Sequence, residues 1–406
     1  MNIALLSIGN ELLSGDTLNT NAAWIGRKVT ELGCSVQRQI TVPDDESSIV
    51  DGLNRLIDSK PNYLIITGGL GPTEDDITRT TLFRFVGTEA VFDNDYWSVL
   101  SERFKRFGMN IPESNRNQAL VPALGGVIPN PVGSARGFQF KVDGSILVAL
   151  PGVPAEMKSM MEQTVIPMIA KSVTEPTMIR TLRTTGIPES ALIERIADAT
   201  AGDHGCNIGY YPSLYGVDIR ISSIRQDRVD RLSEELYSLL GSMIYGEGKD
   251  TIEHVIVHTA IEKHKTVSVA ESCTGGLIGH RITEIPGSSA IFKGGLVVYG
   301  NEAKITVLGV EQACINSYGA VSKTTAGQMA TKVMEKFGTD YGLSVTGIAG
   351  PGGGTAEKPV GLVYIGLADS QSNQVREFTF GTDRNRNKLR TSQAALNWLR
   401  VTLQND

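Results

Sequence analysis

The stretch "TVSVAESCTGGLIGHRI", residues 266–282, predicts the class of the fold. Its first half alternates apolar and small polar residues up to Ala270, which is typical of a strand. The letters "ESCTGG" interrupt the alternation, and helical spacing follows. A strand that passes through glycines into a helix is the repeating unit of α/β folds. We therefore expect a strand-to-helix corner here, with hydroxyl and thiol side chains at its tip.

The first part of the chain repeats this plan. "IALLSI" (3–8) and "YLIIT" (63–67) read as buried parallel strands, and each runs into glycine and then a helix. "SILVALPGVPAEMKSMMEQ" (145–163) gives strand, Pro-Gly break and helix. These segments predict a doubly wound α/β domain over residues 1–168, in which ligands bind beyond the carboxyl ends of the strands.

The remaining residues predict two further domains. Between 169 and 248, "TMIRTLRTTGI" and "GVDIRISSIR" alternate like half-exposed strands, and "PESALIERIADAT" and "RVDRLSEELYSLL" have helical spacing. We interpret this region as a small α+β connector without a chemical constellation. Residues 249–406 are predicted to form a third, α/β domain, with strands in "GGLVVYG", "YGLSVTG" and "GLVYIGLA" and a terminal helix in "RNRNKLRTSQAALNWLRVTLQ" (384–404).

Composition narrows the classes of function. The chain of 406 residues has a net charge of −6, which argues against a general nucleic-acid binder, since such proteins present basic surfaces. No apolar run approaches the roughly 18 residues of a membrane span, and the N-terminus reads as a strand rather than a signal peptide. We expect a cytoplasmic protein with neither nucleic-acid nor membrane partners. The four cysteines show no C-x-x-C spacing, so neither a disulfide framework nor structural zinc is expected.

The opening corner poses a choice of nucleophile. Ser272 would be held rigidly beside free amides at the start of a helix, and such amides favour a phosphate or a developing oxyanion. A serine also needs a base, and Lys304, five residues after Tyr299, can act as one if it is buried. The alternative is a solvated Lys304 and a Tyr299 that packs in the sheet.

Neighbouring residues extend this candidate site. Thr274, Gly275 and Gly276 permit close approach of a ligand to the backbone. The loop "VTGIAGPGGGTAEKPVG" (345–361) suits a phosphate or ribose, although a mobile surface loop has the same composition. We interpret Cys273 as a packing residue. His254 and His258 are four residues apart on a helix, and we favour ordinary structural histidines over a metal pair.

Four motifs in this region resemble a known family. "AESCTGG", "PGSSAIFKGGLVVYGNEAK", "YGAVS" and "VTGIAGPGGGTAEKPVG" closely resemble the nicotinamide mononucleotide deamidase domain of the competence/damage-inducible protein A (CinA) family. The resemblance implies hydrolysis of nicotinamide mononucleotide to nicotinic acid mononucleotide and ammonia, without a cofactor, and it implies a homodimer. It makes Ser272 the nucleophile. The other roles that it implies are activation by Lys304 and Tyr299, oxyanion binding or positioning by Ser289, nucleotide binding by Thr346, Gly347 and Gly350, and binding of the substrate phosphate by Arg384.

The N-terminal domain carries a second constellation. "SIGNELLSGDTLNTNAAWIG" (7–26) places polar residues after the first strand, and "LIITGGLGPTEDDITRTTL" (64–82) gives a strand, a glycine loop and three acidic residues. The loop amides suit phosphate oxygens, and carboxylates beside them suit a divalent cation. The alternative is that Glu74, Asp75 and Asp76 only complement a helix dipole. "NPVGSARGF" (130–138) and "LPGVPAEM" (150–157) supply two more loops.

These four stretches resemble the N-terminal domain of the same family, which is related to molybdopterin-binding domains. The resemblance implies a metal-dependent ADP-ribose pyrophosphatase, with potassium also implicated, that yields AMP and ribose 5-phosphate. Its alternative is a pterin- or nucleotide-binding module without turnover. We assign metal or water handling to Asp75, Asp76 and Glu156, and ligand contacts to Asn21, Gly68, Gly69, Gly71 and Thr73. Both substrates are products of NAD breakdown, so the chain is predicted to be a bifunctional hydrolase of pyridine-nucleotide recycling.

Overall fold

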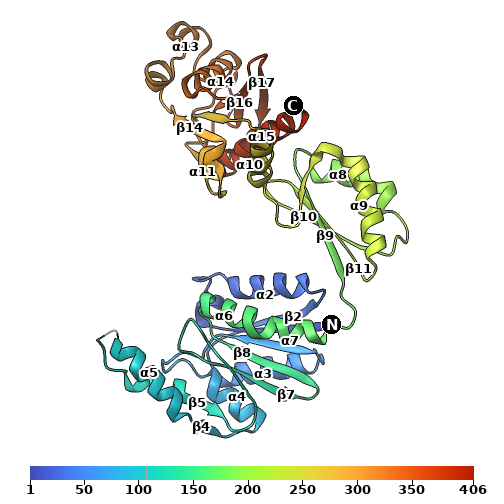
Figure 1. The fold of residues 1–406 in the computed structure, drawn as a ribbon, viewed down its shortest axis with the longest axis vertical. Coiled ribbons are helices and arrows are strands. Elements are labelled where there is room, and N and C mark those ends of the chain that lie inside the picture. Colours follow the sequence, from blue (N-terminus) through green and yellow to red (C-terminus); the bar gives the residue numbers. More distant parts are fainter. Residues whose placement is uncertain (107) are drawn as a thin grey trace. The chain divides into compact units, whose positions relative to one another are not determined.

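The computed structural model describes residues 1–106 and 108–406. They form two compact units, an N-terminal unit from Met1 to Met178 and a C-terminal unit from Ile179 to Asp406 (Figure 1). Both units mix helices and strands, as the sequence predicts. In the described part of the chain, no helix combines the length and the apolar character that crossing a bilayer requires.

The N-terminal unit is built on a six-stranded sheet in the order β2-β1-β3-β8-β7-β6. The strands β2, β1, β3 and β8 are mutually parallel, whereas β7 and β6 are antiparallel to their neighbours. The bounds are β1 (Asn2–Ile8), β2 (Ser35–Val42), β3 (Tyr63–Thr67), β6 (Gly126–Ile128), β7 (Gly137–Val142) and β8 (Ser145–Leu150).

Both faces of this sheet are covered because β1 is apolar on both sides. Ile3 and Leu5 pack in one buried cluster with residues of α2 and α6, and Leu6 packs in another with residues of α3. This two-sided burial is the reason that the parallel strands read as continuous apolar runs. The helical elements are α1 (Asn10–Ser14), α2 (Thr20–Glu31), α3 (Glu46–Ile57), α4 (Thr78–Val86), α6 (Pro154–Met160), the π-helical turn η2 (Met161–Val165) and α7 (Ile166–Ser172).

A small excursion lies between α4 and β6. The strands β4 (Ala90–Phe92) and β5 (Leu120–Pro122) pair in an antiparallel ribbon. Between them lie α5 (Asn94–Arg106) and the 3₁₀ turn η1 (Glu113–Ala119). Among the described residues of α5, only Leu100 is buried, so this helix is attached to the domain by few apolar contacts.

The connector folds into a four-stranded sheet in the order β10-β11-β9-β12. Along β11 every second residue is buried, which is the alternation that the sequence predicted. The elements are β9 (Met178–Thr184), α8 (Glu189–Thr200), β10 (Asn207–Pro212), β11 (Val217–Ser223), α9 (Gln226–Leu240), the 3₁₀ turn η3 (Gly241–Met243) and β12 (Ile244–Glu247). The two predicted helices are therefore present.

The rest of the C-terminal unit is a five-stranded sheet in the order β14-β13-β15-β16-β17. The strands β14, β13 and β15 are parallel, and β16 and β17 are antiparallel. The strands are β13 (Val267–Glu271), β14 (Phe292–Val297), β15 (Tyr341–Gly347), β16 (Leu362–Ala368) and β17 (Asn373–Thr379). The helical elements are α10 (Ile252–Glu262), α11 (Leu277–Thr283), η4 (Ser288–Ala290), α12 (Asn301–Ala303), η5 (Lys304–Leu308), α13 (Gln312–Tyr318), α14 (Lys323–Phe337) and α15 (Arg384–Asn405).

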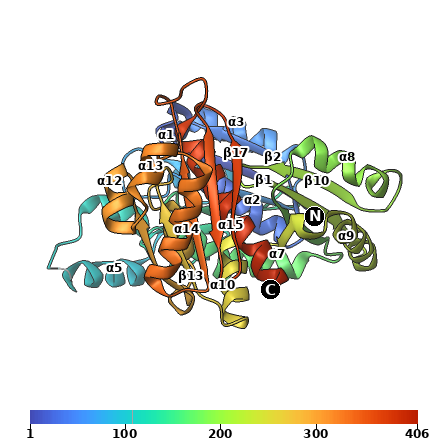
Figure 2. The same cartoon turned by 90° about the horizontal axis from the view of Figure 1, so that it is seen from above.

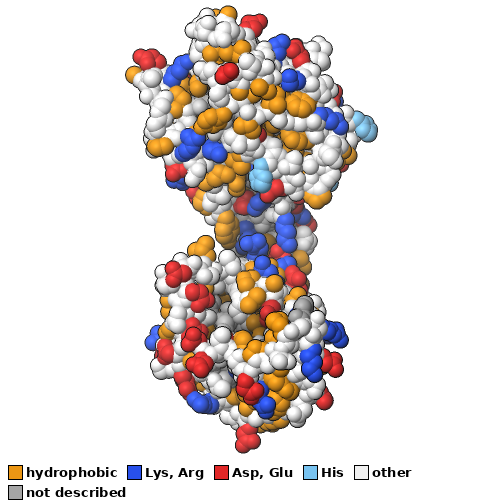
Figure 3. Space-filling view, turned by 90° about the vertical axis from the view of Figure 1, so that its left-hand side faces the viewer, with side chains coloured by type: hydrophobic (Ala, Val, Ile, Leu, Met, Phe, Trp, Pro, Cys, Tyr) orange, Lys and Arg blue, Asp and Glu red, His pale blue; other side chains and the backbone are white. Residues whose placement is uncertain are grey.

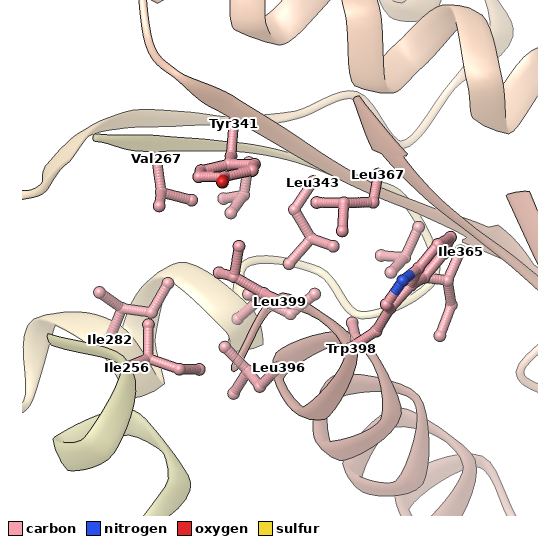
Figure 4. Packing of buried hydrophobic residues seen from close by; sticks show 14 of the residues in the cluster. Ile256, Val267, Ile282, Tyr341, Leu343, Ile365, Leu367, Leu396, Trp398 and Leu399 are labelled. Carbon is pink, nitrogen blue, oxygen red and sulfur yellow. The ribbon is translucent and has the colours of Figure 1, made fainter. Parts of the chain in front are cut away.

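Helices cover both faces of this sheet as well. On one face, Val267, Leu343 and Ile365 pack against Leu396 and Leu399 of α15, as the close view in Figure 4 shows. On the other face, α14 packs along β13, β15 and β16, and its position over the sheet can be followed in Figure 2. The terminal helix begins at Arg384, the residue at which the sequence predicted it.

The sequence analysis ended the N-terminal domain at residue 168, but the N-terminal unit of the structure extends to Met178. The helical run α6-η2-α7 continues to Ser172, and Ile169 is buried in the core of this unit, so position 168 falls inside a helix. The connector and the following domain belong to one compact unit. Their separation near residue 248 stays a prediction.

Candidate active sites

Ser272 lies at the corner between β13 and α11, at the carboxyl edge of the sheet. Its amide donates to the Val345 carbonyl of the neighbouring strand at 3.0 Å, and its carbonyl accepts from the Gly275 amide at 3.1 Å. The turn needs glycine because Gly275 and Gly276 have φ angles of +65° and +94°. The backbone therefore holds the serine rigidly, as a nucleophile requires.

Lys304 is the partner of this serine. Its Nζ lies 3.0 Å from Ser272 Oγ, 2.8 Å from the Val298 carbonyl oxygen and 3.2 Å from the Tyr299 carbonyl oxygen. The side chain is only 1% exposed. It begins the π-helical turn η5, a type of irregularity that often occurs at functional sites. The alternative of a solvated lysine is thereby excluded.

Burial lowers the pKa of Lys304 below its ordinary value, because removal from water disfavours the charged ammonium. A neutral amine has two N–H donors and one lone pair. The carbonyls of Val298 and Tyr299 are acceptors for the two donors, which leaves the lone pair facing Ser272 Oγ. The geometry thus suits a neutral lysine that removes the serine proton.

The amides at the start of α11 are not free, contrary to the expectation from sequence. The carboxylate of Glu271, which is 1% exposed, accepts hydrogen bonds from the amides of Gly276, Ile278 and Gly279 at 3.0, 3.1 and 2.8 Å. These donors cannot bind an oxyanion or a phosphate while the carboxylate holds them. The amides of Cys273 and Thr274, nearer to the serine, are not among the three that it binds.

Sequence reasoning missed the role of Glu271. The signal was a carboxylate at the last position of the strand, a few residues before the start of a helix. Asp and Glu near a helix N-terminus complement its dipole and its unpaired amides.

Cys273 packs in the core, as predicted. It is 5% exposed and lies in the apolar cluster of α10, α11 and α15. Burial raises the pKa of its thiol to about 12, so at neutral pH it is a thiol and not a nucleophilic thiolate. The serine is the better nucleophile at this corner.

Tyr299 contributes its backbone rather than its ring to the lysine. Its carbonyl binds Lys304, whereas its phenol is exposed and accepts a hydrogen bond from Arg384 Nη2 at 2.6 Å. Arg384 also donates through Nη1 to the Gly350 carbonyl at 2.9 Å. The structure therefore brings together Tyr299, Arg384 and the glycine-rich loop, but the phenol has no hydrogen bond with Ser272.

The residues at the end of β15, where the glycine-rich loop begins, are fixed by contacts within the domain. The buried Thr346 hydroxyl donates to the Ala320 carbonyl at 2.7 Å, so it has a structural partner and does not face a ligand. Gly347 has no room for a side chain, since a Cβ atom would lie 2.7 Å from the Leu362 carbonyl oxygen. Gly350 adopts a φ of +91° and presents its carbonyl to Arg384.

Ser289 lies at the wrong edge of the sheet for the predicted role. It precedes β14, whose first residue Phe292 is paired with Val267 at the start of β13. Ser272 follows Glu271 at the other end of β13, roughly 13 Å along the strand. The side chain of Ser289 is exposed. Within one chain it therefore does not contribute to the oxyanion site.

The second site is a cavity of about 650 Å³ at the carboxyl ends of the parallel strands of the N-terminal unit. On this unit, the lower body in Figure 3, acidic side chains gather along one side of the visible face. The cavity is lined by Ile8, Gly9, Asn10, Glu11, Asp44, Gly68, Gly69, Leu70, Gly71, Pro72, Asp75, Asp76, Gln118, Ser134, Ala135, Pro151, Gly152, Val153 and Glu156.

The glycine loop after β3 turns its amides away from α4. The Thr78 amide donates to the Gly69 carbonyl at 3.1 Å, and Arg79 Nη2 donates to the Leu70 carbonyl at 2.8 Å. In a trans peptide the following N–H points opposite to the C=O. The amides of Leu70 and Gly71 are therefore directed away from the helix, and Gly68 and Gly69 have the positive φ angles of an anion-binding nest.

Arg79 was missed by sequence reasoning. It is 2% exposed, and its Nε has no hydrogen-bond partner among the described residues. Burial lowers its pKa to about 10. A buried cation at the start of a helix opposes the helix dipole, so its hydrogen bond to the loop carbonyl and the nearby carboxylate of Asp76 must offset that cost.

The predicted ligand residues divide into two groups. Gly68, Gly69 and Gly71 line the cavity. Asn21 and Thr73 do not line it, and both have structural partners: Asn21 Nδ2 donates to the Gly152 carbonyl at 2.7 Å, and the Thr73 amide donates to Asp76 Oδ2 at 2.9 Å. These two residues shape the loops around the cavity.

Comparison with known proteins places both sites in one family. The chain is 41% identical to a CinA-like protein of Geotalea uraniireducens (strain Rf4) over 412 residues, which covers 99% of this chain and 98% of the relative. The chain belongs to the CinA family. A CinA-like protein of Salinibacter ruber is also 41% identical, over 99% of this chain and 100% of the relative.

Family models match three consecutive segments of this CinA-family chain. They are described as a probable molybdopterin binding domain (4–171), a damage-inducible protein CinA KH domain (179–246) and a CinA C-terminal domain (249–403). The solved structure of the competence/damage inducible protein CihA from Agrobacterium tumefaciens is 41% identical over 38% of this chain and 95% of that chain, with a TM-score of 0.36.

The KH segment of this CinA-family chain is acidic. Between residues 179 and 246 there are 7 Arg, no Lys and 9 Asp or Glu, so its formal charge is 7 − 9 = −2. Nucleic-acid binding draws most of its affinity from phosphate contacts with cations. The composition of the connector therefore gives no electrostatic support for that activity.

The carboxylates of the N-terminal cavity do not form a closed metal site among the described residues. Across residues 1–106 and 108–406, no three His, Cys, Asp or Glu side chains converge closely enough to hold a metal ion, so Asp75, Asp76 and Glu156 do not form a cage. Glu156 is held by Asn130 Nδ2 at 2.5 Å, and Asp76 holds Thr73. The donors fit instead a hard divalent ion that takes one or two carboxylates and completes its shell with substrate phosphates.

Asp44 is an additional carboxylate that sequence reasoning missed. It follows β2 and lines the cavity. Burial raises its pKa, and the negative charges of Glu11, Asp76 and Asp75 add to the shift. The signal was the sequence "VPDD" at the end of an alternating run, because β2 is the parallel neighbour of β1 and ends at the same edge.

Proposed function

We propose that the C-terminal unit hydrolyses the carboxamide of nicotinamide mononucleotide to the carboxylate of nicotinic acid mononucleotide and ammonia. The observation that supports this proposal most strongly is the 3.0 Å contact between Ser272 Oγ and the buried Lys304 Nζ. A serine paired with a desolvated lysine is a known variant of the nucleophile–base pair in acyl transfer. Membership of the CinA family agrees with an enzyme.

In the proposed acylation, neutral Lys304 takes the proton of the Ser272 hydroxyl as Oγ attacks the carboxamide carbon. Lys304 then returns that proton to the amide nitrogen, so the C–N bond breaks and ammonia leaves. The acyl group remains on Ser272 as an ester. Water attacks this ester, Lys304 takes the water proton, and the serine hydroxyl is restored when the carboxylate leaves. No metal takes part in these steps.

The oxyanion of the tetrahedral intermediates needs donors near Ser272. Because Glu271 occupies the amides of Gly276, Ile278 and Gly279, we assign the oxyanion to the amides of Cys273 and Thr274. The Thr274 hydroxyl is fully buried and has no partner among the described residues. Removal of one oxyanion donor costs about 10²–10³ in kcat in other enzymes.

Incubation of the purified protein with nicotinamide mononucleotide and EDTA tests this proposal. Ammonia and nicotinic acid mononucleotide should appear in equal amounts, at a rate that the chelator does not change. A folded protein that releases neither product would contradict the proposal. Activity that EDTA abolishes and divalent cations restore would contradict the metal-free mechanism.

For the N-terminal unit we propose hydrolysis of the diphosphate of ADP-ribose to AMP and ribose 5-phosphate. The observation in favour is the combination of a cavity, a loop with outward amides and nearby carboxylates. A divalent ion held by Asp75 with Asp76 or Asp44 would neutralise charge on the diphosphate. The loop amides of Leu70 and Gly71 would orient its oxygens.

This second activity is tested with ADP-ribose, with and without magnesium, by chromatography of AMP. Formation of AMP that needs the metal would support it. Binding of ADP-ribose without any AMP after hours would favour the alternative of a nucleotide- or pterin-binding module. The Ser272→Ala variant should hydrolyse ADP-ribose at the normal rate, because its change lies in the other unit.

A further inference from the structure

A lysine beside the serine corner has no counterion. Lys388, on the second turn of α15, is half-buried. Among the described residues it forms neither a hydrogen bond nor an ion pair. Partly buried cations are normally paired, so an unpaired one next to a candidate active site indicates a position for an anionic ligand.

The ammonium group of Lys388 lies over the turn that carries the nucleophile. A Cβ atom built on Gly275 would be 3.7 Å from Lys388 Nζ. Gly275 closes the turn by its hydrogen bond to the Ser272 carbonyl. The carboxylate of Glu271, at the start of this turn, accepts hydrogen bonds from three backbone amides. Its oxygens are therefore already occupied, and it does not serve as the counterion of Lys388.

A second cation lies on the same face of α15. Arg384 is four residues before Lys388, a spacing that places two side chains next to each other on a helix. Its guanidinium donates to the Tyr299 hydroxyl and to the Gly350 carbonyl, and both acceptors are neutral. Arg384 and Lys388 therefore place two positive charges between the glycine-rich loop and the Ser272 turn, and no carboxylate in residues 1–106 and 108–406 pairs with either.

We propose that Lys388, together with Arg384, binds the phosphate monoester of the mononucleotide substrate. This inference rests on the proposed deamidase function and adds the residue that makes the enzyme select a nucleotide over its nucleoside. A phosphate carries close to two negative charges at neutral pH and accepts hydrogen bonds from several donors. Lys388 is thus a specificity-determining residue and takes no part in proton transfer.

The test compares two substrates that differ only in the phosphate, nicotinamide mononucleotide and nicotinamide riboside. In Lys388→Gln, kcat/KM for the mononucleotide should fall about tenfold to a hundredfold, mostly through KM, while kcat/KM for the riboside stays within about twofold. Lys388→Arg should retain most of the preference. Arg390→Gln is the matched control, because it removes the same charge from an exposed position two residues further round the helix.

Binding gives an independent readout. In a Ser272→Ala background, calorimetric titration with nicotinamide mononucleotide should show the same loss of affinity on adding Lys388→Gln. An equal fall for both substrates would mean that Lys388 supports the Ser272 turn or the carboxamide, and it would overturn the proposal. Unchanged kinetics for both would also overturn it. A wild-type protein that turns over neither substrate contradicts the deamidase function itself, which is a different result.

Discussion

At the end of β13, Glu271 places its carboxylate on the amides of Gly276, Ile278 and Gly279. At the end of β3, no carboxylate of the described residues accepts from the amides of Leu70 and Gly71, and the preceding carbonyls are hydrogen-bonded to residues at the start of α4. Both corners have a strand, a glycine turn and a helix. The first leaves a serine beside a buried lysine, and the second leaves a nest for an anion. The two corners share a strand, a turn and a helix, and they differ in whether a carboxylate of the strand binds the amides of the turn and the helix.

The largest effect is expected when the lysine of the serine corner is replaced. Lys304→Met removes the base while keeping a similar buried volume, so deamidation should fall at least about 10³-fold. Ammonia release from nicotinamide mononucleotide measures the loss. Lys332→Met, at a partly exposed position on α14 that pairs with Glu335, is the control and should be near wild type. If Lys304→Met kept a tenth of the activity, the serine corner would have another base.

The pH dependence of kcat/KM is a second test of Lys304 as the base. Burial lowers the pKa of Lys304, and the reaction needs the neutral amine. We expect kcat/KM to fall about tenfold per pH unit below that pKa and to level off above it. In the window between the lowered pKa and the ordinary value, the folded chain binds fewer protons than the unfolded chain, so the free energy of unfolding rises with pH there. A profile that is flat down to acidic pH would contradict a lysine base.

Replacing the carboxylate tests what separates the two corners. Glu271→Gln retains the shape of the side chain but loses the charge that three amides bind. The free energy of unfolding of the C-terminal unit should fall by about 2–3 kcal/mol, measured by urea titration. Glu284→Gln removes a charge at an exposed site near α11 and should cost less than about 0.5 kcal/mol. Equal stability of the two variants would show that the amides do not depend on Glu271.

The smallest effect is expected at the N-terminal corner. Arg79→Gln frees the Leu70 carbonyl, so the Gly71 amide is no longer held outward. Affinity for inorganic pyrophosphate, measured by calorimetry, should fall about tenfold, and deamidation should not change. Arg84→Gln is the control, because Arg84 lies on the same helix and makes only an exposed ion pair with Glu46. If Arg79→Gln bound pyrophosphate as tightly as the wild type does, the hydrogen bond from Arg79 to the Leu70 carbonyl would not be needed to orient the loop amides.

The sequence predicted those features that depend on local pattern. The corner after β13, the glycine loop after β3 and the start of α15 at Arg384 follow from periodicity and glycine placement. The residues alone left the Ser272–Lys304 pair open against a solvated lysine, and the family resemblance favoured the pair; in the structure Ser272 follows β13 and Lys304 follows the adjacent parallel strand β14.

The predictions that differ from the structure depend on where side chains point and on the order of the strands. Ser289 is close in sequence to β14, but it precedes that strand and so lies at the opposite edge from Ser272. Tyr299 lies at the right edge, yet its carbonyl rather than its phenol reaches Lys304. Asp44 was missed because β2 was not recognised as the neighbour of β1. None of these facts can be read from residue types alone.

The most direct test of the account is the rate of ammonia release from nicotinamide mononucleotide by two neighbouring variants, Ser272→Ala and Cys273→Ala. The account predicts that Ser272→Ala falls to background, at least about 10³-fold below wild type as for Lys304→Met, and that Cys273→Ala stays within a few-fold of it. Circular dichroism should show that both variants are folded. Substantial activity in Ser272→Ala, or loss of activity only in Cys273→Ala, would contradict the assignment of the serine as the nucleophile.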